Sequence, residues 1–160
     1  MSELLVWNGL VSRPRPLHRQ SGAWDYRFSV NAARLKAIPV FAGLGRRELR
    51  RVAECADEIE VREGEHLLHE GRFAFEFFVI EKGAAEVVRE GIHLADLGPG
   101  DVMGEIAALS HGQRSASVIA KVPTTVIFIR AQDFRHFAEE LPELGEQIRR
   151  VVADRTLPIA

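Results

Sequence analysis

The sequence is poor in cysteine and in long apolar runs, and both absences limit its function. Cys55 is the single cysteine in 160 residues, which excludes an internal disulfide and a zinc site built on cysteine pairs. We expect Cys55 to pack as a small apolar residue in a reducing compartment. No run reaches the roughly 20 apolar residues of a membrane span, and the apolar start at 4–7 is too short for a secretory signal. We therefore predict a cytoplasmic location and no membrane span.

An excess of basic charge is also absent. Lysine and arginine total 21, aspartate and glutamate total 23, and the formal net charge is -2. This balance gives no general electrostatic reason to expect direct binding to nucleic acid. One local basic cluster, made of Arg46, Arg47, Arg50 and Arg51, is interpreted as the solvated face of a helix. The hydrophobic share of 46% is typical of one globular domain.

Residues 1–30 differ from the rest of the chain. The Arg-Pro repeat at 13–16 removes backbone donors and favours extended or loop backbone. Trp7, Trp24 and Tyr26 argue against complete disorder, because large aromatic side chains are usually covered. We interpret residues 1–30 as an N-terminal arm that either packs on its own domain or docks on a partner.

From residue 31 onward the pattern becomes regular and predicts a second unit, at 31–160. Asn31 caps a predicted helix at 32–38, which Pro39 ends, and a second helix follows around 49–56. Helical spacing returns at 133–140 and after Pro142. Between them the period changes to two, which predicts strands at 58–62, 66–69, 75–80, 84–88, 93–97, 117–120 and 124–129. The sequence therefore predicts an α+β, mainly β fold: an antiparallel β-roll or jelly-roll at about 57–130, with N-terminal helices and C-terminal helices at 131–156.

The strand series has one long interruption, at 98–114, and loops on a rigid β scaffold commonly carry binding residues. Residues 106–109 can form a helical turn, whose unpaired N–H groups suit an anion. Gly104 allows close approach to the backbone, and Arg114 offers a planar fork of donors that matches two phosphate oxygens. Glu105 repels a phosphate but accepts a hydrogen bond from a sugar hydroxyl. The pattern indicates a sugar phosphate site, with a plain Glu105–Arg114 ion pair as the alternative.

The two stretches GEIAAL at 104–109 and GQRSASV at 112–118 resemble the phosphate-binding cassette of the cyclic-nucleotide-binding domain family. This family includes the catabolite activator protein, regulatory subunits of protein kinase A and cyclic-nucleotide-gated channels. Segments 38–44, 76–83 and 97–101 are similar to the family's pattern around the cassette, and the resemblance covers about 31–155. It implies a β-roll that binds cAMP or cGMP, with cAMP favoured, and implies neither catalysis nor a cofactor.

The resemblance also implies a role for each cassette residue. Glu105 accepts a hydrogen bond from the ribose 2′-hydroxyl, and Arg114 pairs with the cyclic phosphate. The backbone of Ile106 and Ala107, with the Ser115 hydroxyl, completes the phosphate cradle. The full candidate set is Val102, Met103, Gly104, Glu105, Ile106, Ala107, Arg114, Ser115, Ala116 and Arg155.

Two residues of this region depart from the family's pattern, and a third extends the last predicted helix. Met103 stands where the family commonly has an aromatic residue, and Gln113 replaces a common proline. Arg155 continues the apolar stripe of the last predicted helix. This helix resembles the family's lid, which closes over the base of the nucleotide. The Arg155 guanidinium either lies over a purine or extends into water.

Two other functions compete with the sensor interpretation. A metal-dependent, cupin-like enzyme would use His66, His69, Glu70 and Glu76, but two residues three apart in a strand are expected on opposite faces. The second alternative is an interaction module of the same fold that binds no nucleotide. No output domain is visible, so we expect an unidentified effector protein or domain, controlled by a ligand-dependent shift of the helices.

Overall fold

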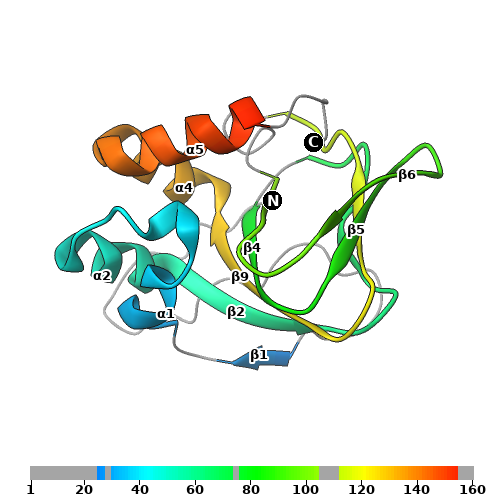
Figure 1. Cartoon of the computed structure of the whole chain (residues 1–160), viewed down its shortest axis with the longest axis horizontal. Coiled ribbons are helices and arrows are strands. Elements are labelled where there is room, and N and C mark those ends of the chain that lie inside the picture. The colour runs from blue at the N-terminus through cyan, green and yellow to red at the C-terminus, as the bar shows by residue number, and fades with distance from the viewer. Residues whose placement is uncertain (1–24, 28–29, 74–75, 105–111, 155–160) are drawn as a thin grey trace, which may run out of the picture.

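Two β-sheets pack face to face, and the helices gather on the outer face of one of them (Figure 1). This arrangement is seen in a computed structural model that describes residues 25–27, 30–73, 76–104 and 112–154. Glu105, Ile106, Ala107 and Arg155, which the sequence predicts to be ligand contacts, lie outside the described residues. The predicted α+β class, an antiparallel β-roll flanked by helices, is confirmed.

One sheet has the strand order β1-β2-β9-β4-β7 and the other β3-β8-β5-β6, with every neighbouring pair antiparallel. Their bounds are β1 (Asp25–Arg27), β2 (Ala56–Val61), β3 (His66–Leu68), β4 (Glu76–Lys82), β5 (Ala85–Arg89), β6 (Ile92–Leu97), β7 (Val102–Met103), β8 (Ser117–Ala120) and β9 (Thr124–Arg130). Every strand predicted from the alternation is confirmed, with ends within about two residues. The short strands β1 and β7 were not predicted, because neither is long enough to show a period.

Strand β4 separates two hydrophobic clusters. Phe77 and Val79 belong to the cluster under the helices, whereas Phe78 and Ile80 belong to the cluster between the sheets. Successive side chains of a strand point to opposite faces, so a strand with both faces covered is apolar throughout. The run Phe77 to Ile80 is buried on both faces for this reason.

The helices begin and end where local signals place them. They are α1 (Ala32–Lys36), α2 (Arg46–Cys55), α4 (Ala131–Glu140) and α5 (Pro142–Asp154), with a 3-10 helix at Pro39–Phe41. The Asn31 side chain accepts a hydrogen bond from the Arg34 backbone N–H at 2.9 Å, which confirms the predicted cap. Arg46, Arg47, Arg50 and Arg51 are all exposed on α2, as expected for a solvated face. No helix in the described part of the chain is both long and apolar enough to cross a membrane.

Candidate functional site

The backbone of Arg114 is held beside the chain that leads into β4. The Arg114 N–H donates to the Arg72 carbonyl at 2.7 Å, and the Gly71 N–H donates to the Arg114 carbonyl at 2.8 Å. Phe73 and Gln113 form an isolated antiparallel bridge next to this pair. Arg114 is therefore anchored by long-range backbone pairing before its side chain makes any contact.

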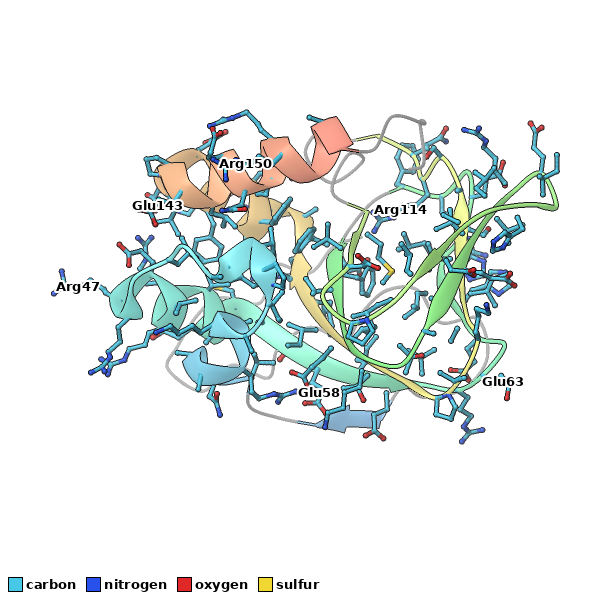
Figure 2. The ribbon with its side chains drawn as sticks, viewed as in Figure 1. Arg47, Glu58, Glu63, Arg114, Glu143 and Arg150 are labelled. Carbon is cyan, nitrogen blue, oxygen red and sulfur yellow. The ribbon has the colours of Figure 1, made fainter. Side chains whose placement is uncertain are left out.

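The Arg114 side chain turns inward, and the residue as a whole is 5% exposed (Figure 2). Its Nη1 donates to the Gly104 carbonyl at 3.0 Å, and its Nη2 donates to the Glu76 carbonyl at 2.5 Å. The carboxylate Oε2 of Glu76 lies 4.0 Å from the same Nη2. A buried charge is costly unless it is paired at short range. Among the described residues, two backbone carbonyls and the Glu76 carboxylate hold the guanidinium in place.

Gly104 permits this position of Arg114. Its φ is +81°, in the left-handed region that favours glycine. A β-carbon on residue 104 would collide with the Arg114 guanidinium and crowd the Glu76 carbonyl. Gly104 was predicted to allow approach of a ligand, and in the structure it allows close approach of the arginine that is expected to bind that ligand.

Ser115 carries a buried polar atom that the fold does not satisfy. Among the described residues, its Oγ is the buried side-chain oxygen or nitrogen for which no hydrogen-bond partner is found. Leaving a buried hydroxyl unpaired costs about 1–3 kcal/mol. Such atoms in a native structure commonly mark a ligand, ion or water position. The orphaned Oγ follows directly after the buried guanidinium, which fits a site for an anion with acceptor oxygens.

Glu76 belongs to the site, although the sequence suggested it only as a metal ligand. It is 4% exposed, and burial raises its pKa to about 7, with the positive charge of Arg114 opposing part of that rise. In the sequence, Glu76 is marked only as a glutamate at the start of an apolar strand. Arg114, which it contacts, lies 38 residues further along the chain. Only the pairing of distant segments shows it.

The other described members of the candidate set, Val102, Met103 and Ala116, are core residues. Val102 packs under the helices, whereas Met103 and Ala116 pack between the sheets. On α5, Arg149 and Arg150 are exposed and both lie within ion-pair distance of Glu146. Any contact of these residues with a ligand stays a prediction.

The cavity beside Arg114 is small in the described structure. It is lined by Leu67, Leu68, His69, Arg72, Phe73, Glu76 and Arg114, and it measures about 10 Å³, the space of about one water molecule. The described residues thus form an anion cradle and not a complete nucleotide cavity. The candidate site is identified by its charge and by its unsatisfied hydroxyl.

The expectation that His66 and His69 point to opposite faces is wrong. Their rings stack at 4.6 Å between centroids, with 2° between the planes. Strand β3 ends at Leu68, and its pairing with β8 shifts register between His66 and Leu68. The strict alternation of a strand therefore does not reach His69. Within the described ranges, no group of three or more histidine, cysteine, aspartate or glutamate side chains has the spacing of a metal site.

Comparison with known proteins identifies the family. Residues 58–140 match the family model described as the cyclic nucleotide-binding domain. The chain belongs to this family. The match covers the roll from β2 to β9, the cassette and α4.

Two curated relatives and one solved structure illustrate the similarity. The chain is 29% identical over 119 residues to a cyclic nucleotide-gated potassium channel of Rhizobium etli, covering 74% of this chain and 33% of the channel. It is 28% identical over 96 residues to a cAMP-dependent protein kinase regulatory subunit of Yarrowia lipolytica, covering 60% of this chain and 26% of the subunit. A cyclic nucleotide-binding domain from Methylobacillus flagellatus shares the fold, with a TM-score of 0.72, 20% identity and coverage of 82% and 83%. The matched region thus spans about a third or less of the length of these two curated relatives.

Proposed function

We propose that this chain binds a cyclic nucleotide through Arg114 and acts as a sensor or regulatory domain. Two observations carry the proposal: the Arg114 guanidinium is buried and donates to backbone carbonyls, and the next residue in the chain, Ser115, has a buried hydroxyl for which no partner is found among the described residues. A cyclic phosphodiester brings one negative charge and acceptor oxygens, so it satisfies both groups at once. The predicted roles of Glu105, Ile106 and Ala107 complete the proposal.

The described contacts also offer a route from the site to the helices. Phe77 follows Glu76 in β4, and its ring stacks on Phe134 of α4 at 3.9 Å between centroids. Helix α4 in turn packs on α5 through the cluster under the helices. We propose that nucleotide binding shifts α4 and α5 relative to the roll, with Arg155 as the predicted lid residue. A ligand shifts such an equilibrium only by its difference in affinity for the two states.

We propose cAMP as the ligand ahead of cGMP. The support is the similarity to a subunit named as cAMP-dependent. The proposed partner is an effector protein or domain, and the proposed location is the cytoplasm. We propose no catalytic activity for this domain.

Titration calorimetry with the cyclic 3′,5′-monophosphates of adenosine, guanosine, cytidine and uridine tests the proposal. We expect wild-type protein to bind cAMP most tightly. Arg114→Ala is expected to weaken binding about ten- to a hundredfold, because it removes about 1.5–3 kcal/mol of charge-assisted hydrogen bonding. Arg47→Ala is the matched control, since Arg47 is exposed on α2, and its affinity should equal that of wild type.

The alternatives make different predictions for the same samples. A nucleotide-independent interaction module would bind none of the four compounds. Preference for a base other than adenine would retain the site and correct the ligand. Equal affinity of wild type and Arg114→Ala would contradict the assignment of Arg114. A tightly held metal ion in purified protein would favour the cupin-like enzyme instead.

A further inference from the structure

Glu76 approaches Arg114 with two different groups. Its backbone carbonyl accepts a hydrogen bond from Nη2 of Arg114 at 2.5 Å, and its carboxylate Oε2 lies 4.0 Å from that same nitrogen. The Arg114 and Glu76 side chains are 4% and 5% exposed. Glu76 is thus placed to influence the charge that the guanidinium presents to a ligand.

Several other charged or titratable groups surround Glu76. His69 and Arg72 line the same small cavity. Arg130 of β9 is the register partner of Glu76, and it is ion-paired with Asp133 of α4 at 3.0 Å. Glu105, next to Gly104 in the chain, lies outside the described residues. The positive charge of Arg114 acts on the Glu76 carboxyl and opposes part of the rise in its pKa that burial causes.

We infer that Glu76 is a positioning residue that competes with the bound cyclic phosphate for Arg114, so that nucleotide binding is coupled to uptake of a proton by Glu76. The inference rests on the proposed function of the Arg114 site. A single guanidinium cannot match two anions in a buried site, and a like charge nearby favours the neutral form of a carboxyl. The proton removes the charge of Glu76 while Arg114 keeps its contact with the backbone carbonyl.

The direction of the pH effect follows from linkage. Burial already raises the pKa of Glu76 to about 7 in the free protein, and a phosphate on Arg114 raises it further. The bound state therefore holds its proton more tightly than the free state. Affinity is highest below about pH 7 and falls as the pH rises toward the pKa of the complex. Each unit of difference between the two pKa values corresponds to about tenfold in affinity.

The test measures cAMP affinity between pH 6 and pH 8.5 at constant ionic strength. We expect wild-type protein to bind about five- to tenfold more weakly at pH 8.5 than at pH 6. Glu76→Gln copies the neutral carboxyl, so its affinity should be independent of pH and should exceed that of wild type at pH 8.5. A purely structural role for Glu76 would give weaker binding at every pH.

Two control variants and one direct measurement accompany the profile. Glu63→Gln removes an exposed carboxylate of the β2–β3 turn and should keep the wild-type dependence. His69→Gln removes the histidine of the same cavity and should also keep it. Calorimetry at pH 7.5 in buffers of different ionisation enthalpy should show uptake of a fraction of one proton by wild type and none by Glu76→Gln.

The outcomes separate the inference from the function on which it rests. Tight binding that does not depend on pH, or a pH dependence that persists in Glu76→Gln, overturns the inference and leaves the sensor function intact. Loss of the dependence in His69→Gln but not in Glu76→Gln also overturns it. Failure of wild type to bind any of the four cyclic nucleotides at any pH overturns the proposed function and the inference together.

Discussion

Arg34 and Arg114 each join distant segments of the same roll, but their side chains bind different kinds of partner. Arg34 of α1 donates to both carboxylate oxygens of Glu81, at 2.9 and 2.7 Å, and its Nη2 lies 2.5 Å from Glu58. The hydrogen bonds to Glu81 are the largest cause of the raised pKa of Arg34. Arg114 is more deeply buried, but it donates to two carbonyls and has its carboxylate at 4.0 Å. In the described contacts, Arg34 is held by short pairs with carboxylates, whereas Arg114 is held by hydrogen bonds to backbone carbonyls.

The space beside Arg34 is much larger than the space beside Arg114. The surface beside Arg34, lined also by Ile38, Pro39 and Gly100, is hollowed to about 580 Å³, against about 10 Å³ beside Arg114. The space at Arg34 is next to a guanidinium that is paired with two carboxylates, whereas the residue that follows Arg114 in the chain, Ser115, has a buried hydroxyl for which no partner is found among the described residues. A deeply buried guanidinium and an unsatisfied hydroxyl therefore identify this site better than the volume of the neighbouring space does.

Removal of Arg34 is expected to give the largest effect on stability. Arg34→Ala leaves Glu58 and Glu81 without their cation and releases α1 from β2 and β4, and we expect a loss of about 3 kcal/mol in the free energy of unfolding. Urea unfolding of wild type and Arg34→Ala measures it. Nucleotide affinity of the folded variant should stay within about twofold of wild type. An affinity loss as large as that of Arg114→Ala would remove the distinction between the two arginines.

The next largest effect is expected in the pH dependence of stability, which Glu76 contributes beside Arg114. Burial raises the pKa of Glu76 from 4.5 to about 7, so the folded state binds its proton more tightly than the unfolded state. The stability that this proton contributes is fully present below about pH 4.5 and is lost as the pH rises through 7. Between pH 5.5 and pH 7.5 the loss amounts to about 2 kcal/mol.

Urea unfolding of wild type and Glu76→Gln at both pH values isolates this contribution, because the other titrating groups are common to the two proteins. We expect the free energy of unfolding to fall more steeply with pH in wild type than in Glu76→Gln. Identical pH dependence of the two proteins would show that Glu76 titrates at its ordinary value in the folded state.

Ser115 is expected to give the smallest effect, with opposite signs for stability and binding. Ser115→Ala removes a buried hydroxyl without a described partner, so the ligand-free protein should gain up to about 1 kcal/mol of stability. Nucleotide affinity should fall about fivefold, the scale of one hydrogen bond. Thermal unfolding without ligand and calorimetry with cAMP measure the two values. A loss of stability in Ser115→Ala would show that the hydroxyl already has a structural role.

Local signals explain why most of the fold was predictable. The alternation of β2 and β9, the Asn31 cap and the stop at Pro39 depend on neighbours in sequence. The cassette was predictable because its glycine, arginine and serine lie within about a dozen residues. The stacking of His66 on His69 was not predictable, because a register shift in the pairing of β3 with β8 determines it.

By itself, the sequence determined the order of helices and strands, the position of the cassette and the identity of the arginine expected to bind phosphate. The tertiary structure decided which charges meet. Arg34 reaches Glu81 across 47 residues, and Arg114 reaches Glu76 across 38. Electrostatic matching depends on distances of a few ångströms, which the packing of distant strands sets and no local pattern encodes. For that reason the proton-linked role inferred for Glu76 emerges only from the folded chain.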